Sequence, residues 1–255
     1  MVAYGTKFGA ERVGQDAVMD EEDEPTTLGR SETPRGEVVL RRRGEVEELL
    51  VNGTFAMDSS ETHSERELGR VAAGAPRVLV GGLGLGHTVV AVLDEADRLG
   101  LDVRVDVVEL EAALVGWARE GRTPTLARVA ADPRVRLHVG DVATVLVGLR
   151  GGPAGPWDAI LLDVDNGPDF LIHAGNDVLY AEPTLRAAYG RLAPAGVLAI
   201  WCQAPSPPLL AALRRVDASA EETRHTVQRE GRTFTYAIET VRRPVSRGPA
   251  GGGAG

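Results

Sequence analysis

The sequence is poor in the residues that build disulfides and metal clusters. Cys202 is the only cysteine, which excludes an internal disulfide and a cysteine-based metal cluster. His63, His87 and His173 are scattered along the chain without the spacing of metal ligands, so no metal is expected. A Gly-Lys-Ser/Thr phosphate loop and a Gly-x-Ser-x-Gly nucleophile turn are also missing, which argues against the enzyme classes that depend on them.

Long apolar runs and an excess of positive charge are missing as well. No run approaches the roughly 20 apolar residues that cross a bilayer. The first thirty residues show no basic segment followed by an apolar stretch, so a cytoplasmic protein with no membrane partner is expected. The formal net charge of −9 argues against a nucleic-acid partner and mildly favours cationic partners.

Composition divides the chain into four parts. Residues 1–35 are acidic and poor in apolar residues, which predicts a disordered arm. Residues 36–70 hold short β-type runs and an Asn-Gly turn signal, and therefore predict a small N-terminal β-hairpin element. Residues 71–245 alternate strand and helix patterns, and residues 246–255 read as a flexible glycine-rich tail.

A strand, a glycine-rich loop and a helix follow one another from Arg77 to Leu99. The uncharged run after Arg77 is typical of a buried central strand, and it breaks at once into Gly82, Gly84 and Gly86. The next residues carry apolar side chains at helical spacing. Backbone N–H groups and the positive end of a helix dipole can then approach a ligand with no Cβ in the way, so the three glycines are predicted to bind a cofactor.

Acidic residues follow the next two predicted strands. Glu109 lies at the end of the strand 103–110, where a carboxylate can accept hydrogen bonds from both hydroxyls of a ribose. Asp141 follows the third strand and could bind an adenine amino group, or cap the helix that begins at Val142. Both residues are predicted to bind the cofactor.

The loop after the fourth strand, Asp163–Pro168, gathers further polar side chains. Asp163 and Asp165 are predicted as catalytic residues, because two neighbouring acids suit one as proton acceptor and the other as anchor for an ammonium group. The alternative is a turn whose acids only cap the next helix. Asn166 and Tyr180 are predicted to bind the substrate, although a packed tyrosine would explain Tyr180 equally well.

The order of elements predicts an α/β fold with a mostly parallel seven-stranded sheet and helices on both faces. It ends in a predicted antiparallel hairpin, residues 222–228 and 233–241. Dinucleotide-binding dehydrogenases usually continue with another crossover, whereas the Rossmann-like class I methyltransferase fold closes with such a hairpin. Residues 71–245 are therefore interpreted as a Rossmann-like nucleoside-binding catalytic domain.

From about Val46 to Val241 the chain resembles the spermidine synthase (polyamine aminopropyltransferase) family. The resemblance implies that the glycine loop, Glu109 and Asp141 hold a sulfonium nucleoside, either S-adenosylmethionine or its decarboxylated form, as co-substrate. It further implies that Asp163 helps to deprotonate an amine acceptor in polyamine biosynthesis, and that the protein is a homodimer. The matching segments are Leu49–Gly53, Gly82–Gly86, Glu109, Gly140–Asp141, Asp163–Pro168, Leu179–Tyr180 and Gly196–Leu198.

Several positions depart from this family. Leu85 stands where the family carries an aspartate that selects the decarboxylated donor, and Ala56, Glu65 and Arg66 stand where it lines the amine pocket. An S-adenosylmethionine-dependent methyltransferase on the same scaffold is therefore an alternative. A catalytically silent nucleotide-binding homologue and a dinucleotide oxidoreductase also stay open.

Overall fold

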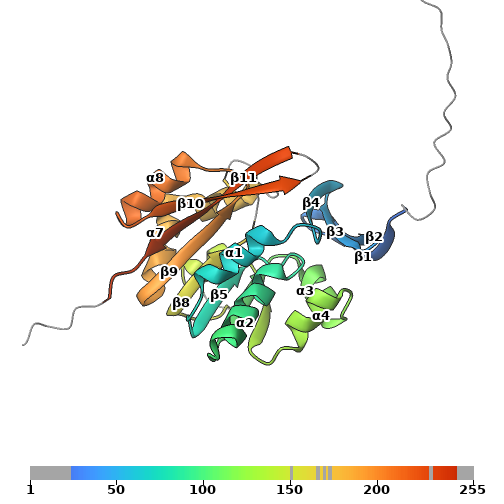
Figure 1. Cartoon of the computed structure of the whole chain (residues 1–255), viewed down its shortest axis with the longest axis horizontal. Coiled ribbons are helices and arrows are strands. Elements are labelled where there is room, and N and C mark those ends of the chain that lie inside the picture. The colour runs from blue at the N-terminus through green and yellow to red at the C-terminus, as the bar shows by residue number, and fades with distance from the viewer. Residues whose placement is uncertain are drawn as a thin grey trace, which may run out of the picture.

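The computed structural model describes residues 24–149, 152–164, 167–168, 171, 174–229 and 232–245 (Figure 1). It consists of a four-stranded antiparallel sheet followed by a seven-stranded sheet with helices on both faces. The tail predicted at 246–255 and most of the predicted arm lie outside the described residues. Among the described helices, none has the length and apolar character needed to cross a membrane.

The large sheet confirms the predicted α/β fold. Its order is β10-β11-β9-β8-β5-β6-β7. The strands from β9 to β7 run parallel to one another. Strand β11 pairs antiparallel with β9, and β10 pairs antiparallel with β11. The strands are β5 (Arg77–Gly81), β6 (Arg104–Glu109), β7 (Val135–Val139), β8 (Trp157–Leu162), β9 (Leu192–Cys202), β10 (Glu221–Arg229) and β11 (Arg232–Arg242).

The central strand β5 is buried on both faces because its alternate residues enter different cores. Val78 and Val80 belong to the core that packs under α1, α2, α3 and α4, whereas Leu79 belongs to the core under α5, α7 and α8. The helices are α1 (His63–Val71), α2 (His87–Leu99), α3 (Ala112–Arg119), α4 (Pro124–Ala131), α5 (Val142–Leu146), α6 (Asp177–Tyr180), α7 (Glu182–Gly190) and α8 (Pro207–Val216), and a 3-10 turn spans Ala174–Asn176.

The N-terminal sheet is larger than the predicted hairpin element. It contains β1 (Thr26–Thr33), β2 (Gly36–Arg43), β3 (Val46–Val51) and β4 (Thr54–Asp58) in sequential order. Strand β1 lies within the stretch predicted as a disordered arm, so that prediction is wrong for residues 26–33. Pairing with β2 stabilises this polar strand, and its Gly29 packs directly on the indole of Trp117.

The loops that follow β5, β6, β7 and β8 meet at one edge of the large sheet, because all four strands run in the same direction. The N-terminal sheet lies beside this edge, next to α3 (Figure 1). Arg35, in the turn between β1 and β2, donates a hydrogen bond of 2.6 Å to Glu111 at the start of α3. The four-stranded sheet therefore forms a wall over the predicted site.

Candidate functional site

The loop between β5 and α2 requires glycine at two crowded positions. Gly82 and Gly84 have φ angles of 91° and 51°, a region that other residues rarely adopt. A Cβ on Gly82 would lie 2.0 Å from the carbonyl oxygen of Asp163, and one on Gly84 would lie 2.6 Å from Sδ of Met57. The glycines thus let the loop pass against both the β8 end and strand β4.

The third predicted glycine has a different role. Gly86 has a φ angle of 90° and occupies the N-cap of α2. It faces Val129 and Leu126 of α4 rather than the other predicted site residues. The backbone of Gly86 therefore directs the chain into the helix, while Gly82 and Gly84 form the surface that a ligand can approach.

Glu109 lies where the sequence predicts it, at the end of β6, and its carboxylate is nearly buried. One oxygen accepts a hydrogen bond of 2.7 Å from the Leu83 N–H, and the other accepts one of 2.7 Å from the Glu111 N–H. Burial raises the pKa of Glu109 above its ordinary value, against the opposing effect of these hydrogen bonds. The side chain thus connects the glycine loop to the start of α3.

Asp141 caps a helix, which is one of the two roles that the sequence left open. Its Oδ1 accepts a hydrogen bond of 2.8 Å from the Ala143 N–H, so the residue caps α5. The same side chain faces the cavity described below. Capping is therefore established in the structure, and binding of an adenine amino group stays a prediction.

Asp163 follows β8 and is held by a hydroxyl group. Thr88, in the first turn of α2, donates a hydrogen bond of 2.6 Å to Oδ2 of Asp163. Burial raises the pKa of the Asp163 carboxyl above its ordinary value, and the Thr88 hydrogen bond acts in the opposite direction. A raised pKa makes the ionised carboxylate a better proton acceptor than an ordinary aspartate.

Glu65 is a further candidate site residue, which the sequence marked only as a departure from the amine-pocket positions of the resembled family. It lies on α1 with only 8% of its surface exposed, and it accepts a hydrogen bond of 2.6 Å from the Ser64 hydroxyl. Burial, and then the negative charge of Asp163, raise the pKa of Glu65 to about 7. The signal was present, because Glu65 shares the inward helix face of Leu68 at a spacing of three residues.

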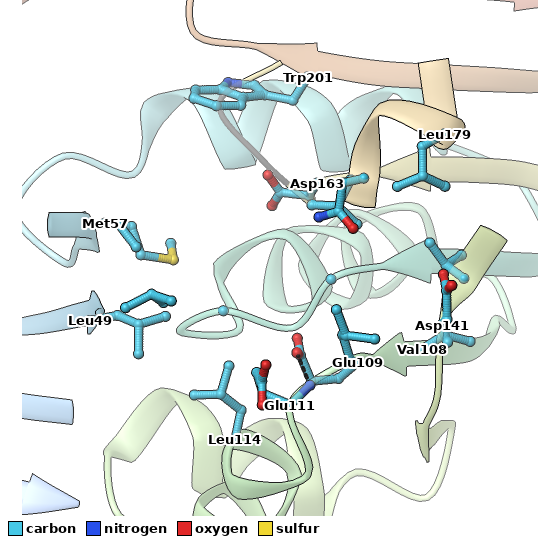
Figure 2. Close-up of a pocket in the computed structure, with 18 of the residues that line it drawn as sticks. Leu49, Met57, Val108, Glu109, Glu111, Leu114, Asp141, Asp163, Leu179 and Trp201 are labelled. Carbon is cyan, nitrogen blue, oxygen red and sulfur yellow. Dashed lines mark hydrogen bonds between the residues drawn. The ribbon is translucent and has the colours of Figure 1, made fainter. Parts of the chain in front are cut away.

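These side chains line one cavity between the two sheets (Figure 2). Five acids line it, and no Lys, Arg or His does so among the described residues. Glu111 is neutralised by Arg35, which does not itself line the cavity. The acids are Glu65, Glu109, Glu111, Asp141 and Asp163, and the N-terminal sheet adds an apolar wall of Leu49, Val51, Ala56 and Met57.

Other predicted residues lie elsewhere. Tyr180 is buried in the core under α7 and α8, so the packed alternative holds, and its neighbour Leu179 lines the cavity instead. Leu85 is fully buried in the other core and sends no side chain into the cavity. Asp165 and Asn166 lie outside the described residues. Within the described chain, no three His, Cys, Asp or Glu side chains are grouped to hold a metal ion.

Comparison with known proteins gives similarity in sequence and in fold. No protein-family model matches the chain. Spermidine synthase 1 of Hyoscyamus niger is 32% identical over 124 residues, which are 48% of this chain and 35% of that protein. The match thus spans about a third of that relative's length.

Two solved structures extend the similarity over most of the chain. The spermidine synthase from Thermotoga maritima has a TM-score of 0.65 at 14% identity, covering 84% of this chain and 72% of that one. A probable spermidine synthase from Corynebacterium glutamicum has a TM-score of 0.52 at 17% identity, covering 83% and 78%. The predicted resemblance is confirmed: the chain is similar to spermidine synthases in sequence over about half of its length, and it shares their methyltransferase-like fold.

Proposed function

We propose that this protein is a transferase that moves an aminopropyl group from a sulfonium nucleoside to an amine acceptor. The observation that carries the proposal is the charge of the cavity, which five carboxylates line without a basic side chain among the described residues. A sulfonium donor and an ammonium acceptor are both cations, and each would relieve the cost of burying several carboxylates in one cavity. The spermidine synthase-like sequence and fold support the same reaction class.

The donor is proposed to lie against the glycine loop. The backbone of Gly82 and Gly84 allows close approach, and the remaining lone pairs of Glu109 accept hydrogen bonds from the ribose hydroxyls. Asp141 lies at the end of β7, where its carboxylate can receive the adenine amino group. The residues present therefore fit a sulfonium nucleoside at this edge of the sheet.

Asp163 is proposed to take part in deprotonating the acceptor amine. The neutral nitrogen then attacks the carbon bonded to sulfur in line with the breaking bond, so proximity and orientation supply most of the rate. Asp165 as an anchor for an ammonium group and Asn166 as a substrate contact follow from the sequence and remain part of the proposal. A homodimer likewise remains a prediction.

The lining of the cavity favours the decarboxylated donor over intact S-adenosylmethionine. The carboxylate of the intact donor needs a cationic or multiple N–H partner when it leaves water. The described lining offers no Lys, Arg or His for that purpose. Methyl transfer from the intact donor is the second candidate, favoured by the absence of an acidic side chain at Leu85.

Calorimetric titration with the two donors separates these reactions. The proposal expects tighter binding of the decarboxylated donor, and mass spectrometry should then detect an amine enlarged by an aminopropyl group. Preference for the intact donor with methylated amine as product would favour the methyltransferase. Binding of either donor without any transfer would support a catalytically silent homologue.

Asp163→Asn tests the proposed proton acceptor. Turnover should fall by about 10²- to 10⁴-fold, while donor affinity should remain within a few-fold of the parent. The matched control is Asp158→Asn on the same strand, since Asp158 accepts a hydrogen bond from the Arg77 N–H at the opposite end of β8. Equal activity of Asp163→Asn and the parent would remove Asp163 from the reaction.

A further inference from the structure

Glu65 faces the cavity without a cationic partner. Three groups influence the pKa of its carboxyl: Asp163, which lines the same cavity, and the Ser64 hydroxyl and Glu61 on the same chain segment. Tyr236 of β11 lies close enough for Glu65 to raise its pKa. No Lys, Arg or His forms an ion pair with Glu65 in the described part of the chain. Such an acid can be ionised only at a cost, and a bound cation would reduce that cost.

Trp201 gives an independent sign that this end of the cavity suits a cation. Its indole comes from β9 and lines the same cavity as Glu65 and Asp163. Figure 2 shows the ring near Asp163, on the side of the cavity opposite Glu109 and Glu111. An indole face attracts ammonium groups more strongly than any other side-chain ring.

We infer that Glu65, Asp163 and Trp201 together bind the reacting ammonium group of the acceptor, and that Glu65 receives its proton. This inference rests on the proposed function and adds a catalytic residue to it. The acceptor ammonium transfers one proton to the Glu65 carboxylate and becomes a neutral amine. Its nitrogen lone pair then forms the new bond to the carbon attached to sulfur.

The electrons and protons balance in this step. The carbon–sulfur bond breaks with both electrons on sulfur, so the sulfonium becomes a neutral thioether and the product nitrogen becomes a secondary ammonium ion. Glu65 afterwards releases its proton to solvent. The remaining, apolar wall of the cavity is formed by Leu49, Val51, Ala56 and Met57, which suits the methylene chain of a linear alkyl amine.

The main test compares Glu65→Gln with Glu67→Gln in the full chain, with 1,4-diaminobutane as acceptor. Glu67 lies two residues further along α1, pairs with Arg70 and does not line the cavity. Glu65→Gln should raise the KM for the diamine at least tenfold and lower kcat, with donor affinity unchanged. In the parent, kcat/KM should rise with pH through about 7, where Glu65 loses its proton, and this limb should be absent from Glu65→Gln alone.

A second readout does not depend on turnover. Diamine binding is measured by calorimetry in buffers of different ionisation enthalpy, in the presence of the unreactive thioether nucleoside. Proton exchange that accompanies binding to the parent should disappear in Glu65→Gln and persist in Glu67→Gln. Trp201→Leu should weaken diamine binding more than Trp201→Phe, because only phenylalanine keeps an aromatic face.

The possible failures can be told apart. If the parent transfers an aminopropyl group and Glu65→Gln matches it in KM, kcat and pH profile, the role of Glu65 is wrong while the proposed function stands. If the parent transfers no group to any amine, the proposed function itself is wrong. Loss of donor binding in a folded Glu65→Gln variant would also contradict the inference, since it would place Glu65 at the nucleoside.

Discussion

Gly82 shows how closely the site depends on the absence of a side chain. Its backbone has a left-handed φ angle, and a Cβ would meet the carbonyl oxygen of Asp163 at 2.0 Å. The added Cβ and the carbonyl oxygen are both fixed to the backbone, so neither can move away from the other independently. Because Asp163 is also proposed to take part in deprotonating the acceptor, crowding at Gly82 should disturb stability and activity together.

Gly82→Ala is expected to lose more stability than backbone strain alone explains. Gly100→Ala is the matched control, since Gly100 also has a positive φ angle of 65° but has no atom within 4 Å of an added Cβ. The control should cost about 1 kcal/mol, and Gly82→Ala should cost at least about 2 kcal/mol more. Urea denaturation measures both, and equal losses would show that the close approach is unimportant.

Glu65 makes a prediction about stability against pH. The pKa of Glu65 is raised to about 7 in the folded protein from an ordinary value of 4.5, so the folded state binds this proton more tightly than the unfolded state. The contribution of Glu65 is fully present below pH 4.5 and is lost as the pH rises through about 7.

Glu65→Gln should therefore gain stability over the unliganded parent protein at pH 8.5, compared with the same difference at pH 5.5. The difference in the free energy of unfolding should be about 2 kcal/mol, because pH 5.5 lies about 1.5 units below the raised pKa of Glu65. Glu67→Gln, which replaces a half-buried acid paired with Arg70 on the same helix, should show no such pH-dependent gain. Parallel stability curves for the parent and Glu65→Gln would mean that Glu65 has an ordinary pKa.

Site residues that follow strands could be predicted from the sequence more readily than Glu65, which lies on a helix. Glu109 and Asp163 were predictable because the ends of neighbouring parallel strands must meet at one edge. Glu65 was harder to predict, because its spacing to Leu68 indicates that it faces inward but the chain order does not say which helix face closes the cavity. For Tyr180 the sequence left packing and substrate binding equally open; the residue is buried in the core under α7 and α8, and Leu179 lines the cavity.

At the scale of elements, α5 depends on its cap. The helix spans only Val142–Leu146, and the Asp141 side chain satisfies the Ala143 N–H at its start. A helix of this length has little stability of its own. The same carboxylate faces the cavity, so capping and proposed ligand binding can be separated only by substitutions that keep one of them.

Asp141→Asn should keep the cap and lose donor affinity, because asparagine retains an oxygen that accepts the Ala143 N–H but has no charge. Asp141→Ala should lose both, with a stability loss of about 0.5–2 kcal/mol. Thr123→Ala, which removes the corresponding cap of α4, should lose similar stability without affecting the donor. Thermal denaturation and calorimetry give the two quantities, and unchanged donor affinity in Asp141→Asn would leave Asp141 as a cap alone.

The ends of helices and strands can be predicted where glycine or proline marks them, and they differ from the sequence pattern where pairing with a neighbouring strand sets them. Helix α2 begins and ends as predicted, between glycines at both ends. Thr123 and Pro124 mark the start of helix α4, whereas nothing of this kind marks the start of β9 at Leu192. The early part of β9 contains Pro194 and Gly196, residues that usually end a strand, and it pairs with the start of β8.

For the whole molecule, electrostatics favour the approach of cationic acceptors. The formal net charge is −9 and the described cavity lining contains acids without bases. Long-range attraction of this kind weakens as salt shortens the screening length from about 10 Å at 0.1 M to about 3 Å at 1 M.

The KM for 1,4-diaminobutane should rise several-fold between 0.05 M and 0.5 M NaCl. Singly charged 1-aminobutane should show a smaller rise, and the affinity for the uncharged thioether nucleoside should not change. Steady-state kinetics and calorimetry at each salt concentration measure these effects. A KM for the diamine that is independent of salt would mean that the acids contribute little to acceptor binding.

The acids lie on opposite sides of the cavity, and this has a consequence for product release in the proposed reaction. Figure 2 places Glu109 on one side and Asp163 on the other. During transfer, positive charge migrates from sulfur, which becomes neutral, to the nitrogen beside Asp163. The spent nucleoside thereby loses its electrostatic attachment to the protein, so the next donor cation should displace it readily and inhibition by this product should be weak.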